Sequence, residues 1–177
     1  MVTVETFVEN HLVSPVKILF ITENCPNYGN YFYRTLPGNP HLIGGPNHNL
    51  LNNLCIATGI MAANENDKLN IFLNNRKYAV IDTYVNGVLW ELTPPHHNIP
   101  DICEDIISLN PEQIVFTSIR SNKRLFAPIV AGLPPHLRTR IIIRSDGGNV
   151  FNSPCDWAFT GFLNQINSVI AAGTLVL

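Results

Sequence analysis

The sequence predicts an α/β fold, a three-layer α/β/α sandwich around a central four-stranded parallel sheet. Short apolar runs rich in β-branched residues recur along the chain, and such continuous runs are typical of strands buried on both faces. Segments with apolar residues at helical spacing alternate with these runs, which favours parallel strands joined by crossover helices. The chain has 177 residues, so we expect residues 1–177 to form a single domain.

The predicted strands and helices follow one another in order. The apolar runs predicted as strands are 16–22 (VKILFIT), 78–85 (YAVIDTYV), 113–119 (QIVFTSI) and 140–143 (RIII). The first helix is expected to begin near Asn47 or Asn49, either of which is a suitable cap, and Asp101 is a candidate cap for a later helix. Helical spacing also predicts helical segments over 69–75, 101–109, 123–130 and 157–172.

The charge of the chain limits the kinds of partner it would bind. The formal net charge is -2 and the sequence pI is about 6.3, so there is no general basic field that would attract nucleic acid. Charged residues make up 14% of the chain, against about 25% in an average soluble protein, which favours a compact core. Any contact with DNA would therefore have to be local.

The cysteines do not have the spacing of a metal site. Cys25, Cys55, Cys103 and Cys155 lie tens of residues apart with no C-x-x-C pair, so we expect free thiols, no metal cluster and no cofactor. The first residues lack the basic and apolar regions of a signal peptide. No apolar run approaches the roughly 20 residues needed to cross a bilayer. These features predict a cytoplasmic protein without a membrane partner.

Polar side chains lie near the carboxyl end of each predicted strand or just beyond it. They are Glu23 and Asn24, then Asp82 and Thr83, then Thr117 and Ser118, and finally the loop 144–148 (RSDGG). In open α/β sheets, ligands bind outside the carboxyl ends of the strands. We therefore expect these residues to gather around one binding site.

The stretch ITENCPNYGNYFY, residues 21–33, resembles the first motif of the uracil-DNA glycosylase superfamily. In that motif a strand runs into a Gly-x-Asp-Pro, Gly-x-Asn-Pro or Glu-x-Pro loop and an aromatic follows. The stretch is most similar to an uncharacterised branch with a Glu-Ser-Pro-Pro loop and a Tyr-Phe-Tyr cluster. The similarity continues through a second strand ending in Asp82, a third strand, and a fourth strand followed by RSDGGN, where the family has a His-Pro-Ser-type loop. RSDGGN contains no histidine.

The resemblance implies a uracil-DNA glycosylase-like fold and a monofunctional DNA glycosylase that needs no cofactor. Cleavage of an N-glycosidic bond passes through an oxocarbenium-like sugar, which needs a water or an anion beside it. Asn24 matches the water-orienting asparagine of the family, whereas Glu23 has the chemistry of a general base, and both stay candidates. Arg144 or the amides at Gly147 and Gly148 are the candidate donors to the departing base, and Ser145 is a weaker one.

The resemblance also implies how the base would be bound. Phe32 is expected to stack on a flipped base, with Tyr28 as a further contact in the same loop. Asp82 occupies the place of a base-reading Asn or Asp. An ionised Asp only accepts hydrogen bonds, so an amino-bearing or modified base is expected to be preferred over uracil.

Two other functions remain open at this point. The missing histidine is compatible with a catalytically silent relative that binds nucleic acid or a nucleotide. The acidic balance of the chain would also suit an N-glycosidase of free nucleosides or nucleotides. In each case the expected partner is single- or double-stranded DNA, or a nucleotide.

Overall fold

A computed structural model describes residues 15–22, 49–83, 99–117 and 121–177. Its sheet has three parallel strands, β1 (Ile18–Thr22), β2 (Tyr78–Asp82) and β3 (Gln113–Phe116), in the order β2-β1-β3. Strands and helices alternate along the chain, so the predicted α/β class is confirmed.

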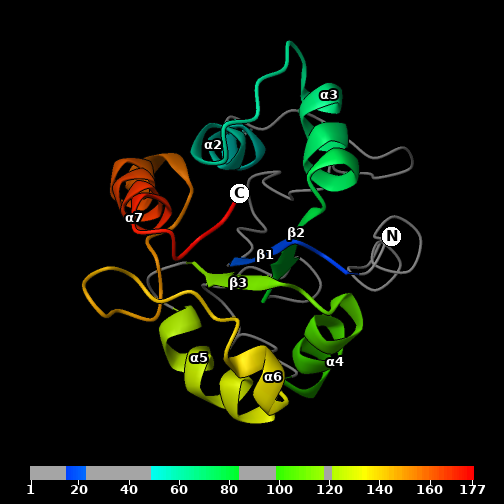
Figure 1. The fold of residues 1–177 in the computed structure, drawn as a ribbon, viewed down its shortest axis with the longest axis vertical. Coiled ribbons are helices and arrows are strands. Elements are labelled where there is room, and N and C mark those ends of the chain that lie inside the picture. Colours follow the sequence, from blue (N-terminus) through cyan, green and yellow to red (C-terminus); the bar gives the residue numbers. More distant parts are fainter. Residues whose placement is uncertain (1–14, 23–48, 84–98, 118–120) are drawn as a thin grey trace, which may run out of the picture.

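Helices cover both faces of this sheet (Figure 1). One layer contains α2 (Asn49–Ala57), α3 (Glu65–Asn70), the π-helical turn η2 (Ile71–Asn75) and α7 (Phe159–Ala171). The other layer contains α4 (Ile99–Leu109), α5 (Ser121–Gly132) and α6 (Pro135–Arg138). This arrangement confirms the predicted three layers among the described residues.

The central strand β1 supplies both halves of the core. Ile18 and Phe20 pack into the cluster beneath α2 and α7, whereas Leu19 and Ile21 pack into the cluster beneath α4 and α5. Consecutive strand residues point to opposite faces, so a strand covered on both sides must be apolar at every position. Burial on both faces therefore explains why the run VKILFIT in the sequence is continuously apolar from Ile18 to Ile21.

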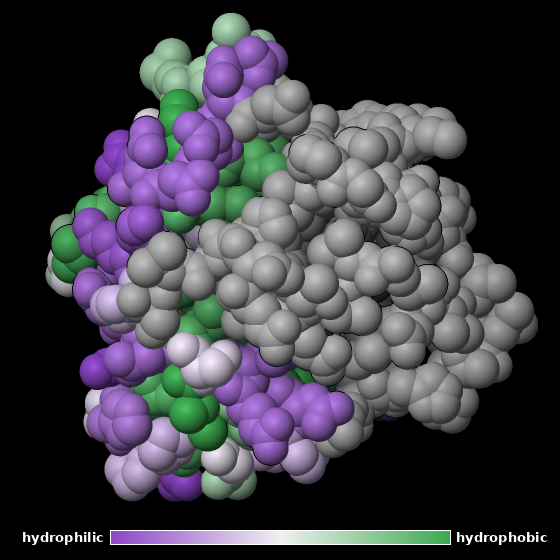
Figure 2. All heavy atoms as spheres, turned by 90° about the vertical axis from the view of Figure 1, so that its right-hand side faces the viewer, coloured by the Kyte–Doolittle hydropathy of each residue, from purple (hydrophilic) through white to green (hydrophobic). Residues whose placement is uncertain are grey.

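The outer surfaces of the layers mix hydrophilic residues with exposed apolar side chains such as Ile56, Ile107 and Trp157. Figure 2 shows hydrophilic residues over the outer parts of the two helical layers, with hydrophobic residues visible between them. In α7, which lies within the predicted helical segment 157–172, Phe162, Ile166 and Val169 are buried. Among the described helices, none combines the length and the apolar character needed to cross a membrane.

The predicted fourth strand, 140–143, forms only an isolated bridge. Ile141 pairs with Ile114 in parallel, and the chain then leaves the sheet through a turn and returns at Phe151, which pairs with Thr117. The described sheet therefore has three strands, with two separate bridges along the outer edge of β3. The turn interrupts the ladder because its backbone groups bond to one another instead of to β3.

Several predicted boundaries shift. The predicted piece 69–75 divides into the end of α3 and the turn η2, and a short 3-10 turn, η3 (Asp156–Ala158), precedes α7. Asp101 lies inside the first turn of α4 and is not its cap. The first helix begins at Asn49, while Asn47 lies outside the described residues.

We expect Gly132 to be required for the close packing of α5 on α4. A methyl group added at Gly132 would lie 2.7 Å from Sγ of the buried Cys103. Gly132→Ala should therefore lower the free energy of unfolding by about 1–3 kcal/mol in denaturant titrations. Adding Cys103→Ala should restore part of that loss, because it removes the clashing sulfur atom.

Cys155→Ala is the control for this pair. Cys155 lies beside η3 in the opposite layer, so its effect should simply add to that of Gly132→Ala. If the free energies of unfolding of both double variants departed equally from the sum of the single effects, the contact between Gly132 and Cys103 would not be the cause of the destabilisation by Gly132→Ala.

Candidate functional site

The carboxyl ends of the three strands lie side by side. Thr22, the last residue of β1, pairs with Asp82, the last residue of β2. Thr83 donates its backbone N–H (2.9 Å) and its hydroxyl (3.2 Å) to the carbonyl oxygen of Thr22. On the other side, Thr117 donates its N–H (2.8 Å) and hydroxyl (3.0 Å) to the carbonyl oxygen of Ile21. These buried threonines lock the ends of the strands to one another.

Most of the residues predicted for catalysis and base binding belong to a part of the chain that the structure does not describe. Glu23, Asn24, Tyr28 and Phe32 are outside the described residues. For Asp82 the structure gives the backbone position at the end of β2. What the structure brings together is the pair Thr22 and Asp82, and Glu23 follows Thr22 directly in the sequence.

Arg144 lies at the same edge, through the chain that returns to β3. Its Nη1 donates to the carbonyl oxygen of Val150 at 2.8 Å, and the next residue, Phe151, pairs with Thr117 at the end of β3. The turn between these points is closed by the N–H of Arg144, which donates to the carbonyl oxygen of Gly148 at 2.9 Å. Gly147 has a φ of +84°, a conformation that favours glycine.

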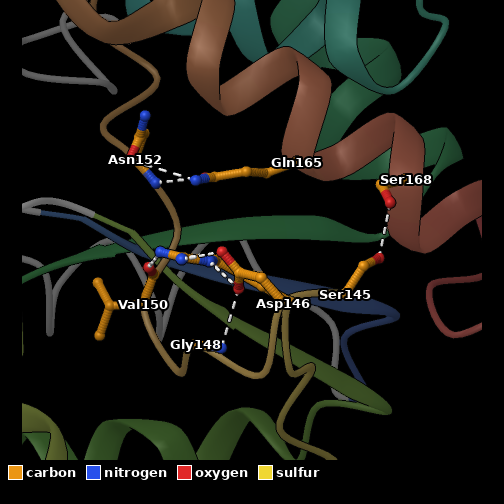
Figure 3. Close-up of polar contacts among 8 residues, drawn as sticks. Ser145, Asp146, Gly148, Val150, Asn152, Gln165 and Ser168 are labelled. Atoms are coloured by element: carbon orange, nitrogen blue, oxygen red, sulfur yellow. Dashed lines mark hydrogen bonds and ion pairs between the residues drawn. The ribbon is translucent and has the colours of Figure 1, made fainter.

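Arg144 and Asp146 form a forked ion pair inside this turn (Figure 3). Nε of Arg144 donates to Oδ1 of Asp146 at 2.8 Å, Nη2 donates to Oδ2, and the N–H of Gly148 donates to Oδ1 at 3.0 Å. These donors, above all the Arg144 side chain, lower the pKa of Asp146 to about 2. The hydrogen bonds from Arg144 to Asp146 raise the pKa of the guanidinium.

Gly148 makes room for this pair. A methyl group on Gly148 would lie 2.6 Å from Cζ of Arg144, so the guanidinium packs directly against the backbone of the turn. The predicted site residues Arg144, Gly147 and Gly148 therefore form one unit. Its cation is bonded to a carboxylate within the turn.

Two contacts fasten the turn and the returning chain to α7 (Figure 3). The hydroxyls of Ser145 and Ser168 lie 2.7 Å apart. The N–H of Asn152 donates to Oε1 of Gln165 at 2.7 Å, and Nε2 of Gln165 donates back to Oδ1 of Asn152 at 3.3 Å. Ser145, predicted as a weak donor to a ligand, therefore has an α7 hydroxyl as its partner.

The structure shows a second loop at this edge that was missed in the sequence. Because the chain reaches the end of β3 at Phe151, the residues that follow the fourth segment are Asn152 to Asp156, in addition to the turn 144–148. Asn53 on α2 is buried and donates to the carbonyl oxygen of Pro154 (2.8 Å) and to Oδ1 of Asp156 (2.9 Å). The signal for this contact was a polar residue within the apolar repeat of α2.

Cys55 and Cys103 are buried free thiols of the core, and Cys155, at the margin of the core, forms no disulfide with either of them. Burial raises the pKa of Cys55 to about 11, against a smaller lowering by Lys68. Burial also raises the pKa of Cys103. Within the described ranges, His, Cys, Asp and Glu side chains form no group of three able to hold a metal ion.

Comparison of the chain with protein-family models, with curated proteins and with solved structures gives no match. The residues of this chain are therefore what its function must be inferred from.

We expect the carboxyl of Asp146 to titrate near pH 2, which carbon-detected NMR can measure. Because this pKa lies below the usual value of 3.8, the ion pair stabilises the fold above about pH 4, and its contribution is lost as the pH falls towards 2. Arg144→Gln should move the pKa of Asp146 back towards 3.8, since the main donor is removed.

Arg124→Gln is the matched control. Arg124 is exposed on α5, and its substitution removes the same positive charge as Arg144→Gln. If both variants moved the titration of Asp146 equally, net charge and not the forked contact would set its pKa.

Proposed function

We propose that the protein is a cytoplasmic DNA glycosylase that hydrolyses the N-glycosidic bond of a damaged or modified base. The observation that carries this proposal is the pairing of Thr22 with Asp82 at the carboxyl edge of the sheet. It makes Asp82 a neighbour of the residue that directly precedes the predicted catalytic pair, Glu23 and Asn24. Ligands of open α/β sheets bind at this kind of edge.

The chemistry requires few groups. A water or an anion must stabilise the oxocarbenium-like sugar, and a donor must meet the charge that develops on the departing base. Glu23 would act as a base on the water, or Asn24 would orient it. Asp82 would accept a hydrogen bond from an exocyclic amine and so favour an amino-bearing base.

Arg144 is the candidate donor to the departing base. It lies at the same edge as Asp82, because Val150 and Phe151 join its turn to the end of β3. A guanidinium has five N–H donors, and three of them are used on Asp146 and Val150. The amides at Gly147 and Gly148 belong to the same turn.

The fold supports the proposal in its general form. The bridges at Ile141 and Phe151 occupy the position of a fourth strand beside β3, and we propose that they correspond to the fourth strand of a uracil-DNA glycosylase-like sheet. The order β2-β1-β3 with this fourth segment is that of a doubly wound fold.

A catalytically silent binder of nucleic acid or nucleotides is the second candidate. The forked pair with Asp146 favours it, because a guanidinium already bonded to a carboxylate is a weaker donor to a departing base. The salt dependence of binding separates the two kinds of ligand. A DNA duplex contacted at many phosphates gives a steep slope, whereas a mononucleotide gives a shallow one.

We expect base release in a single-turnover assay on single- and double-stranded oligonucleotides that contain uracil, hypoxanthine, xanthine, cytosine or modified cytosines. Alkali cleavage of the abasic product is the measurement. Glu23→Gln or Asn24→Ala should slow the reaction by about 100-fold or more, whichever residue handles the water. Glu104→Gln, an exposed carboxylate change on α4, should leave the rate unchanged.

The assay also decides between the two candidates. If the protein binds oligonucleotides or nucleotides but releases no base from any substrate, the glycosylase proposal is wrong and the silent binder stands.

We expect Asp82→Asn to change which base is released. The amide adds a donor to the acceptor that the carboxylate provides, so the variant should gain activity on uracil relative to amino-bearing bases, by about 10-fold or more. The ratio of single-turnover rates on matched oligonucleotides measures this change. An unaltered ratio, with activity retained, would contradict the role of Asp82 in reading the base.

A further inference from the structure

The turn 144–148 has the chemistry of an anion site that already holds an anion. Nε and Nη2 of Arg144 and the N–H of Gly148 all point at the carboxylate of Asp146 (Figure 3). Two donors from one guanidinium and one backbone amide are also the donors that bind a phosphate group. The carboxylate of Asp146 therefore stands where two oxygens of a phosphate would fit.

The cation of this site is held independently of Asp146. Nη1 of Arg144 donates to the carbonyl oxygen of Val150, and the guanidinium packs on the backbone at Gly148, where a methyl group would lie 2.6 Å from Cζ. The side chain of Arg144 is 21% exposed, whereas that of Asp146 is 61% exposed. The carboxylate is thus the more exposed half of the pair.

We propose that Arg144 and the N–H of Gly148 form a phosphate-binding site, and that the carboxylate of Asp146 occupies this site until a phosphate group displaces it. The inference rests on the proposed function for its choice of a nucleic-acid or nucleotide phosphate as the ligand. Its geometry rests on the described turn alone.

The position of the turn suits this role. Arg144 is joined through Val150 and Phe151 to the carboxyl end of β3, the edge at which a nucleotide would lie. The contact between Ser145 and Ser168 ties the turn to α7, so the donors have a fixed place on the protein. A phosphate held here would position the rest of a nucleotide along the edge of the sheet.

Asp146 lowers the apparent affinity of the site for every anion. A ligand must compete with a carboxylate that is part of the same turn, so a weak or singly placed anion gains little. The apparent affinity is reduced by the fraction of molecules in which the site is open. Removing the competing carboxylate should raise the affinity by the same factor.

The experiment follows phosphate binding through the Nε–H signal of Arg144 and the N–H signal of Gly148 in nitrogen NMR. The probes are inorganic phosphate, thymidine 5′-monophosphate, a short oligothymidylate and thymidine without phosphate. We expect both signals to shift with a phosphate-bearing probe and not with thymidine. Asp146→Ala should bind inorganic phosphate about 10-fold more tightly than the natural chain, and Arg144→Gln should lose the binding.

Controls separate this site from a general effect of charge. Glu104→Ala removes an exposed negative charge from α4, and Arg124→Gln removes an exposed positive charge from α5. Asp146→Asn keeps an acceptor for the N–H of Gly148 and so tests the loss of charge without loss of the turn. If neither Asp146 variant binds phosphate more tightly than Glu104→Ala, or if Arg144→Gln binds it like the natural chain, the inference is overturned.

The probes also distinguish the source of the phosphate. Binding of the monophosphate without the oligothymidylate identifies a terminal phosphate, and binding of both identifies a backbone phosphate as well. If the protein binds phosphate at this site but releases no base, the phosphate site is supported and the glycosylase proposal is wrong. If the protein releases bases but the NMR signals of Arg144 and Gly148 do not shift with phosphate, the phosphate site is wrong and the glycosylase proposal is supported.

Discussion

The pairing of β1 with a parallel strand on each side is the constraint on which the rest of the structure depends. The residues of β1, Ile18 to Thr22, are almost completely buried, because hydrogen bonds to β2 and β3 occupy both edges of the strand and helices cover both of its faces. Polar groups without partners are costly in such a place, so the strand itself cannot carry chemistry. The one polar residue within β1 is Thr22, at its carboxyl end. The carboxyl edge of the sheet is the place where ligands of open α/β sheets bind.

The same constraint explains the character of the turn after Ile142. A full fourth strand would have extended the sheet, but the chain leaves the edge of β3 and closes a turn around Arg144 and Asp146. Fastening the turn and the returning chain to α7, through Ser145 and Asn152, gives this excursion a fixed position. The chain thus forms fewer backbone hydrogen bonds to β3 than a full strand would. In their place it has a charged loop, anchored to α7, beside the ends of the other strands.

Particular residues show how far sequence reasoning reached. Residues such as Leu19 and Phe162 were placed correctly, because burial on a strand or helix follows from periodicity. The run 140–143 has three successive isoleucines, which favour extended structure and predict a strand wherever the chain goes next. The sequence offers Arg144 as a donor to a ligand, whereas the closed turn places Asp146 and Val150 against its guanidinium. Likewise, the pairing of Asn53 with Pro154 joins segments 101 residues apart, and no local pattern encodes it.

The class of fold, the burial of β1 on both faces and the polar character of the strand ends can all be read from the sequence. These follow from side-chain periodicity and from the cost of burying polar groups, which act on neighbours in the chain. The register that pairs Thr22 with Asp82, and the two bridges in place of a fourth strand, follow from the packing of the whole chain. The same is true of the hydrogen bond from Asn53 to Pro154, which joins segments 101 residues apart. Register and side-chain partnership depend on how distant segments meet, and that is settled by packing the whole chain at once.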